Sequence, residues 1–204
     1  MGVLVNGIWT EDESALTSAA EDGRYRRAGS AFRNWVTPDG DAGPSGVGGF
    51  AAASGRYHLY VAINCPWAHR TMILRRLKGL EEVISMSVAL PKRDPRGWVF
   101  GTGDPAFADH LFGKEALYEI YALGQSDYSG RVTVPVLWDK ERGVIVNNES
   151  SEIIRMLSTA FVEFTDDATD YYPEDSRDTI DAWNERIYET VNNGVYRTGF
   201  ARSQ

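Results

Sequence analysis

The chain has 204 residues, of which 43% are hydrophobic and 25% charged, and 29 acidic against 21 basic side chains give a formal net charge of −8. This length and apolar content suit one large domain, or one domain with part of a second, and exclude a largely disordered chain. The negative charge disfavours nucleic acid and anionic membrane surfaces as partners. The single cysteine, Cys65, excludes an intramolecular disulfide, a multi-cysteine zinc site and a paired-thiol redox motif.

The start of the chain shows no membrane or secretory signal. No run reaches the roughly 18 apolar residues of a membrane span, and the N-terminus lacks the basic start and long apolar stretch of a signal peptide. We therefore expect a cytoplasmic protein with no membrane partner. Residues 1–50 have no sustained periodicity and contain a turn-rich run at 37–49, so we expect them to form an irregular extension.

A strand–helix–strand unit is expected next. Residues 57–64 are rich in β-branched and aromatic side chains, which predicts a buried strand ending at Cys65 and Pro66. Pro66 suits the first turn of a helix, where its missing N–H has no cost. Residues 83–90 predict a second strand reached through that helix, as in the βαβ unit of a parallel strand pair.

The helix between these strands is predicted over residues 67–78. Ile73, Leu77 and Leu80 recur at helical spacing and mark its apolar stripe. Gly79 stands where a helix C-cap is expected.

A short helix, a hairpin and two longer helices are expected after residue 110. Residues 114–123 form a short helical candidate, and the runs at 132–139 and 143–146 have hairpin spacing. Ser150 is expected to be the N-cap of a helix with an apolar repeat made of Ile153, Leu157 and Phe161. After an acidic linker at 165–178, a last amphipathic helix is predicted from the repeat Ile180, Trp183, Ile187 and Val191.

Cys65 is the strongest candidate for chemistry. It falls between a buried strand and a helix start, where first-turn N–H groups and the helix dipole stabilise a thiolate. A free cysteine at an arbitrary position is more often a small buried hydrophobe. The proline that follows and the strand-to-helix position favour the reactive interpretation.

Two further segments have the character of a binding site. A proline inside a strand, as at Pro135, requires an edge, a bulge or a cis bond, and a cis bond turns the Val134 backbone outward to pair with an extended peptide ligand. Glu149 and Ser150 precede a helix, so first-turn N–H groups and the Ser150 hydroxyl form an anion pocket, while Glu149 accepts from an ammonium group. A γ-glutamyl end fits that pair. Taken alone, Pro135 also fits a rigid strand entry, and Glu149 with Ser150 an ordinary N-cap.

Five motifs, taken in order, carry a family resemblance. They are NCPWAHRT at 64–71, GWVF at 97–100, RVTVPVLWD at 131–139, NNES at 147–150 and IYETVNNGVY at 187–196. Together they resemble those of the glutathionyl-hydroquinone reductases, the Xi class of glutathione transferases. The resemblance covers nearly the whole chain from Asn34 onward.

The resemblance implies an α/β thioredoxin-like domain, ordered βαβ then αββα, followed by the start of an all-helical C-terminal domain, usually in a homodimer. The expected divisions are an irregular extension at 1–50, the thioredoxin-like glutathione-binding domain at 51–162, a linker at 163–176 and the beginning of the helical domain at 177–204.

The resemblance also implies roles for individual residues. Cys65 matches the catalytic cysteine, Pro135 the structural cis-proline and Tyr196 a position of the aromatic-substrate pocket. The positions that match glutathione-binding residues are Trp98, Arg131, Val134, Glu149 and Ser150. The Cys65 thiolate is then expected to attack the sulfur of a glutathionyl-hydroquinone, and a second glutathione frees the enzyme as oxidised glutathione. Glutathione is the co-substrate, and no metal is needed.

The remaining candidates are weaker. His69 lies one turn after Cys65, but helix direction points it away from the strand end, so we expect no catalytic role for it. His58 and His110 are interpreted as structural or surface residues. Trp67 and Trp138 are interpreted as core residues.

Family members run well beyond this length, so the end at Gln204 is interpreted as a truncation inside the helical domain. The missing helices are those expected to supply the far wall of the quinol pocket. Two other functions stay open: a non-catalytic glutathione-binding or regulatory module, and an omega-type thiol transferase that removes glutathione more generally. A conventional conjugating transferase is disfavoured, because such enzymes activate glutathione with a Ser or Tyr hydroxyl.

Overall fold

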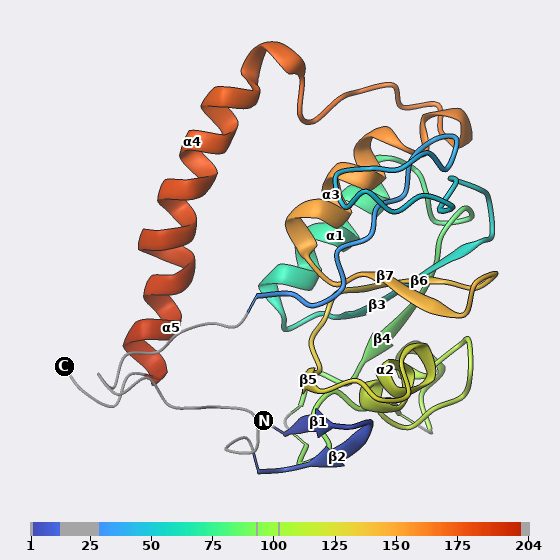
Figure 1. Ribbon diagram of the computed structural model, residues 1–204, viewed down its shortest axis with the longest axis vertical. Helices are drawn as coiled ribbons and strands as arrows, with labels where there is room; N and C mark the ends of the chain where they lie inside the picture. Colours follow the sequence, from blue (N-terminus) through green and yellow to red (C-terminus); the bar gives the residue numbers. More distant parts are fainter. Residues whose placement is uncertain (1, 13–28, 93, 102, 201–204) are drawn as a thin grey trace. The chain divides into compact units, whose positions relative to one another are not determined.

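The computed structural model describes residues 2–12, 29–92, 94–101 and 103–200. They form two compact units. Of the described residues, the first unit comprises 2–12 and 30–169, and the second comprises 29 and 170–200 (Figure 1).

The first unit is built on a mixed four-stranded sheet. Its strands, in spatial order, are β4 (Ser85–Ala89), β3 (Tyr57–Ala62), β6 (Val136–Asp139) and β7 (Val144–Asn147). β3 runs parallel to β4, whereas β6 is antiparallel to both β3 and β7. The predicted parallel pair and the predicted hairpin are both confirmed.

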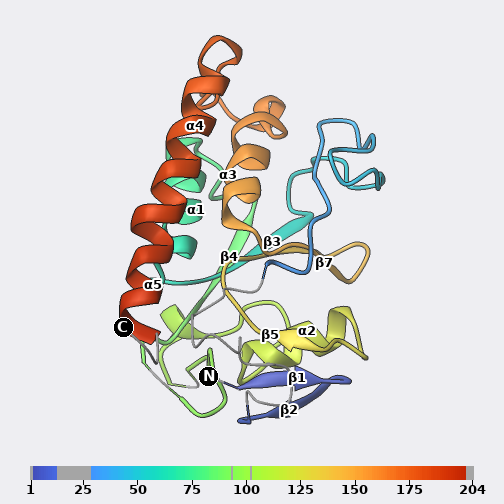
Figure 2. The same cartoon turned by 60° about the vertical axis from the view of Figure 1, so that its left-hand side comes forward.

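Helices cover both faces of this sheet. α1 (Pro66–Leu77) and α3 (Ser150–Thr159) lie side by side on one face, and α2 (Leu117–Gly124) lies on the other (Figures 1 and 2). Two short 3₁₀ turns, η2 (Pro105–Phe107) and η3 (Val162–Phe164), follow β4 and α3. This order of elements confirms the predicted thioredoxin-like fold.

The core lies on both faces of the sheet, because one hydrophobic cluster includes buried residues of α1 and α3 and also of α2. All six residues of β3 are buried, as its largely apolar sequence predicts for a central strand. Ile153, Leu157 and Phe161 are completely buried, which confirms the predicted stripe of α3. The Phe161 ring meets Tyr57 of β3 edge to face, with 5.8 Å between ring centroids.

The predicted stripe of α1 is wrong at two of its three positions. Ile73 and Leu77 are 46% and 51% exposed, and α1 instead buries Ala68, Thr71 and Leu74. Small side chains at the first two of these positions let the helix axis approach the sheet closely, because little volume lies between them.

Gly79 ends α1 as predicted. Its φ of +62° is left-handed, and its N–H donates to Arg76 O while that of Leu80 donates to Arg75 O. These two bonds form a Schellman motif, which satisfies carbonyl groups that the helix end leaves unpaired. Leu80, the third residue of the predicted stripe, is fully buried beyond the helix end.

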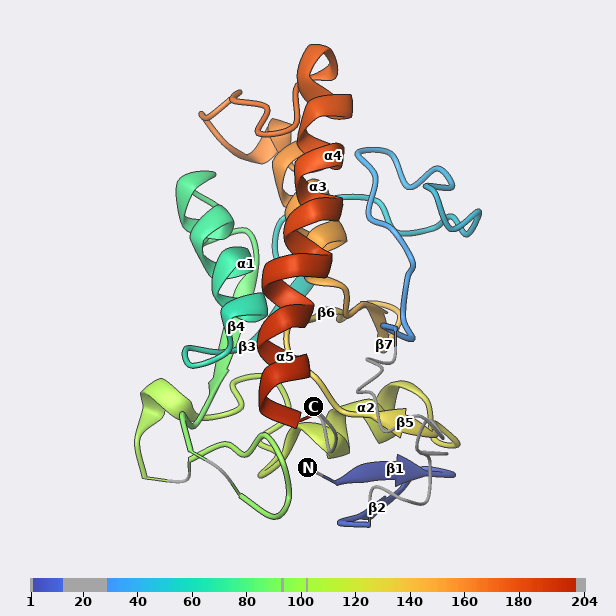
Figure 3. The same cartoon turned by 90° about the vertical axis from the view of Figure 1, so that its left-hand side faces the viewer.

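The expectation that residues 1–50 are irregular is wrong for their first part. β1 (Val3–Val5) pairs with β2 (Ile8–Thr10) and with β5 (Gly130–Arg131), forming a second sheet of order β2-β1-β5 (Figure 3). Asn6 and Gly7 join the first two strands with φ values of +49° and +76°, as in a type I′ turn. Farther along, Val36 and Phe50 are buried in the main core, so this part of the chain packs as part of the first unit.

The second unit is helical in its described part. A 3₁₀ turn η4 (Glu174–Ser176) leads into α4 (Arg177–Ile187), which continues through a π-helical segment η5 (Tyr188–Asn192) into α5 (Asn193–Phe200). The amphipathic helix predicted in this region is confirmed. Within this unit the Tyr172 hydroxyl donates to Asp181, and the Arg177 guanidinium lies 5.3 Å from the centre of the Tyr172 ring.

Candidate functional site at one edge of the sheet

The directions of the strands place several of the sequence motifs at one edge of the main sheet. β3, β4 and β7 point the same way, and β6 points the opposite way. The carboxyl ends of the first three strands therefore meet the start of β6. The first helical turns of α1 and α3 begin at this edge, as the ribbon of Figure 1 shows.

Cys65 occupies the N-cap position of α1 with an extended backbone, φ −101° and ψ 113°. Its side chain makes no capping hydrogen bond and is partly exposed, so the sulfur remains available for chemistry. Sγ lies 3.7 Å from the carbonyl oxygen of Val134. The peptide bond that follows, Val134–Pro135, is cis.

The start of α3 is capped by Glu149, one residue earlier than expected. The Glu149 carboxylate accepts from the backbone N–H of Ser151 at 3.2 Å, and Ser150 is the first helical residue instead of the N-cap. Burial raises the pKa of Glu149, but the hydrogen bonds from Ser151 and Ser30 and the charge of Arg70 outweigh it, so the net pKa lies below its usual value. The cap is therefore a carboxylate at neutral pH.

Arg70 links the two helix starts and was assigned no role from the sequence. It lies five residues after Cys65 on α1, and its Nε and one terminal nitrogen donate to Ser150 Oγ at 3.0 and 2.7 Å. The Arg70 guanidinium also forms an ion pair with Glu149 at 3.7 Å. The guanidinium also lies over the ring of Trp67, 5.1 Å from its centre. No spacing rule relates Arg70 to Ser150, because they are 80 positions apart in the sequence.

The segment just before residue 37 also reaches the start of α3. The Ser30 hydroxyl donates to Glu149 Oε2 at 2.8 Å, and the Phe32 N–H donates to the side chain of Asn148 at 3.1 Å. Arg33 forms an ion pair with Glu152 in the first turn of α3. These contacts were also missed from the sequence, where the segment had only loop character.

Trp98 and Arg131 lie on the segments that flank the edge. Trp98 is partly buried against the core, and the residue after it accepts a backbone hydrogen bond from Leu90, which follows β4 directly. Arg131 ends β5, three residues before Val134, and its carbonyl oxygen accepts from the Tyr128 hydroxyl at 3.0 Å. Tyr196 belongs to α5, in the second unit.

The weaker candidates have structural surroundings. His58 is 1% exposed between two serines of β4, and Trp138 is 1% exposed in the core, as expected. Trp67, expected in the core, is only partly buried and stacks with Arg70 instead. His69 and His110 are exposed.

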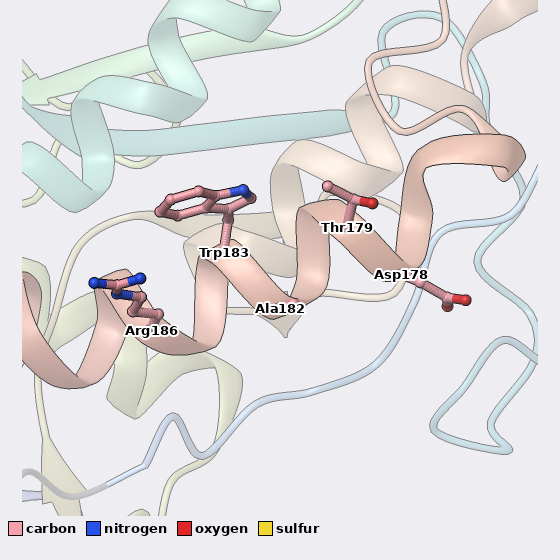
Figure 4. A pocket seen from close by; sticks show the side chains of 5 residues that line it. All are labelled: Asp178, Thr179, Ala182, Trp183 and Arg186. Atoms are coloured by element: carbon pink, nitrogen blue, oxygen red, sulfur yellow. The ribbon is translucent and has the colours of Figure 1, made fainter.

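A shallow hollow on the second unit lies on α4. It is lined by Asp178, Thr179, Ala182, Trp183 and Arg186, all from this helix (Figure 4). The Arg186 guanidinium lies 5.6 Å from the centre of the Trp183 ring. None of the residues singled out from the sequence for chemistry lines this hollow.

The described residues contain neither a metal-binding cluster nor a helix that could span a membrane. In that part of the chain, no three His, Cys, Asp or Glu side chains are grouped so that they could hold a metal ion. No helix there combines the length and apolar character that crossing a membrane requires.

Sequence comparison relates the chain to known proteins. Residues 64–160 match the family described as glutathione S-transferase, N-terminal domain. Over its full length the chain is 52% identical to the glutathionyl-hydroquinone reductase YqjG of Escherichia coli K12 and covers 62% of it. It is 45% identical, again over its full length, to the glutathionyl-hydroquinone reductase PcpF of Sphingobium chlorophenolicum and covers 61% of it. The chain thus spans less than two thirds of the curated relatives it matches.

Solved structures of related transferases are also similar to this chain. The glutathione-bound structure of YqjG matches all of this chain and 60% of that chain, with a TM-score of 0.86 and 50% identity. An Xi class transferase from Natrialba magadii matches with a TM-score of 0.88 and 47% identity, at the same coverage.

Proposed function

We propose that this chain is a glutathione-dependent reductase of glutathionyl-hydroquinones. Its residues 64–160 match the N-terminal domain of glutathione S-transferases, and its whole length is similar to transferases of the Xi class. The observation that carries the proposal is the position of its one thiol. Cys65 is the N-cap of α1, is partly exposed and lies beside the carbonyl of Val134 at the edge where α3 also begins. A reductase with a single protein thiol requires a second thiol from solution, and glutathione supplies it.

We propose that glutathione lies along this edge in an extended form. Its cysteinyl backbone pairs with Val134, and its γ-glutamyl end reaches Glu149 and Ser150, with Trp98 and Arg131 on either side. The ionised state of Glu149 supports this orientation, because a carboxylate accepts hydrogen bonds from the γ-glutamyl ammonium group.

The proposed reaction has two thiol-exchange steps. The Cys65 thiolate attacks the glutathionyl sulfur of the substrate, so that an S–S bond forms and the carbon–sulfur bond breaks. The ring carbon keeps the electron pair of that bond and takes up a proton, which yields the free hydroquinone. A glutathione thiolate then attacks the glutathionyl sulfur of the mixed disulfide, which releases oxidised glutathione and the Cys65 thiolate.

We propose that Tyr196 belongs to the pocket for the aromatic ring, because its phenol combines an apolar face with a hydroxyl that suits a quinol. A homodimer and a cytoplasmic location complete the proposal. The reduced thiol pool that the second step consumes supports that location.

The experiment compares wild-type protein with Cys65→Ser, using glutathionyl-menadiol, held in its hydroquinone form under anaerobic conditions, and excess glutathione. We expect the wild type to release menadiol well above the rate with glutathione alone, and mass spectrometry to find one glutathionyl group on Cys65 when the second glutathione is withheld. Cys65→Ser should bind glutathione but release no menadiol and carry no adduct.

Three results would overturn the proposal. Equal turnover by Cys65→Ser would remove the thiol from the mechanism. Glutathione binding without turnover by the wild type would instead indicate a binding module. Release of glutathione from mixed disulfides, with no menadiol from the thioether, would indicate a general thiol transferase.

A further inference from the structure

Arg70 makes the most specific polar contact between α1 and α3 that the proposed mechanism leaves unexplained. Two of its nitrogens converge on one oxygen, Ser150 Oγ, at 3.0 and 2.7 Å. Ser150 is buried, whereas the Arg70 side chain is one third exposed. Water alone could solvate the guanidinium of a surface arginine. The direction of two donors toward one buried hydroxyl therefore indicates a specific interaction.

The consequence for Ser150 is a fixed hydroxyl direction. A hydroxyl has two acceptor lone pairs and one donor hydrogen. Arg70 occupies both lone pairs, and in the part of the chain that the structure describes the hydroxyl donates to no protein group. Ser150 therefore has only its hydrogen left to offer, and this hydrogen matches an anionic acceptor.

Arg70 also acts on the neighbouring carboxylate and is itself held in place. Its ion pair with Glu149 at 3.7 Å favours the charged form of that side chain. Stacking over Trp67, one turn earlier on α1, limits the rotation of the guanidinium. In a ligand with a carboxylate next to an ammonium group, the carboxylate can then accept from the preorganised Ser150 hydroxyl. The ammonium group can donate to the preorganised Glu149 carboxylate.

We propose that Arg70 is a positioning residue for the γ-glutamyl end of glutathione: it turns the Ser150 hydroxyl into a dedicated donor for the α-carboxylate. This inference rests on the proposed function, because it assumes that glutathione is the ligand of this edge. It adds a residue on α1 to a recognition site that the sequence assigned to α3 alone. Arg70 touches Ser150 rather than the reacting atoms.

The test is a cycle of two substitutions and two ligands, measured by calorimetry. The proteins are wild type, Arg70→Met, Ser150→Ala and the double variant. The ligands are glutathione and 4-aminobutyryl-cysteinylglycine, which keeps the ammonium group but lacks the α-carboxylate. Arg76→Met is the matched control, since Arg76 lies on the same helix with an 83% exposed side chain.

We expect Arg70→Met to weaken glutathione binding roughly tenfold, the usual scale for a hydrogen bond to a charged group. For the analogue, Arg70→Met should weaken binding less than about twofold, because the analogue has no α-carboxylate for Ser150 to bind. In the Ser150→Ala background, Arg70→Met should weaken glutathione binding little further, since the two residues act as one unit. Arg76→Met should bind both ligands as the wild type does.

Several outcomes would overturn the inference. Equal losses for both ligands would indicate a merely structural role for Arg70, and an undiminished loss in the Ser150→Ala background would indicate that Arg70 acts independently of Ser150. Unchanged binding by Arg70→Met would exclude any role. If wild-type protein bound no glutathione at all, the proposed function itself would fail, and that result is distinct from the other three.

Discussion

At the scale of single residues, His58 shows how a buried polar group is kept in one charge state. Its Nδ1 lies 2.8 Å from Ser85 Oγ and its Nε2 lies 2.9 Å from Ser87 Oγ. Two hydroxyls can each donate or accept, so they satisfy both nitrogens of a neutral imidazole. Burial lowers the pKa of His58 to about 4, and this effect outweighs the opposite influence of Asp109.

The unfolding of the chain should therefore become easier as the pH falls from about 6.5 to 4. In this range the unfolded state takes up a proton at His58 that the folded state does not, which lowers the free energy of unfolding by up to about 1.4 kcal/mol per pH unit. Above about pH 6.5, His58 contributes nothing to the pH dependence of the free energy of unfolding. Urea unfolding at several pH values would measure the effect.

The matched variants are His58→Gln and His110→Gln, since His110 is exposed. The slope attributed to His58 should disappear in the first variant and persist in the second. An identical slope in His58→Gln and the wild type would assign the acid sensitivity to carboxylates instead.

The residues of the site differ in how far the sequence could predict them. Cys65 and Pro135 were predictable because their surroundings are set by neighbouring residues in the sequence. Cys65 stands between the end of a strand and a proline that starts a helix, and Pro135 stands inside a predicted strand. Arg70 and Ser30 were not, because each matters through contacts with the start of α3, 80 and 119 positions away. Distant contacts of this kind follow from packing and leave no periodic pattern.

At the scale of elements, strong patterns predicted which segments form strands and helices but not always which face is buried. α3 has one continuous apolar stripe and was predicted correctly. α1 also carries Ile73 and Leu77, yet the sheet receives Ala68 and Thr71, because close packing favours small residues there. The β1–β2 hairpin was missed since three-residue strands show no alternation, and the β1 partner Gly130–Arg131 lies far along the chain.

The junction after α1 contains a buried lysine that joins two elements. The Lys78 side chain is fully buried, and its ammonium group donates to the carbonyl oxygens of Asp167 and Thr169. In return, the Thr165 hydroxyl donates to the carbonyl of Lys78. The chain that leaves α3 is thereby fixed to the end of α1.

Lys78→Met should lower the free energy of unfolding by about 1–3 kcal/mol, because methionine preserves the packed volume but leaves two carbonyl groups without their donor. Urea denaturation of the full chain is the measurement. Lys92→Met is the control, since Lys92 is exposed, and it should unfold as the wild type does. A loss no larger than that of the control would show that water replaces the ammonium group without cost.

At the scale of the whole molecule, the two units differ in what stabilises them. The first unit has a continuous hydrophobic core that includes every residue of β3 except His58. In the second unit, no residue of α4 and η5 is buried, and Trp183 and Val191 are each 56% exposed. Helices gain most of their stability from burying an apolar face, so α4 should open far more readily than β3.

Hydrogen exchange followed by mass spectrometry would test this difference on the intact chain. Peptides from α4 and α5 should exchange within the earliest time points, whereas those from β3 should stay protected until the first unit unfolds globally. Added glutathione should slow exchange at the first turns of α1 and α3, where the proposed site lies, and leave α4 unchanged. Protection of α4 equal to that of β3 would contradict the expected order of stability. Slowing by glutathione confined to α4 would instead move the binding site out of the first unit.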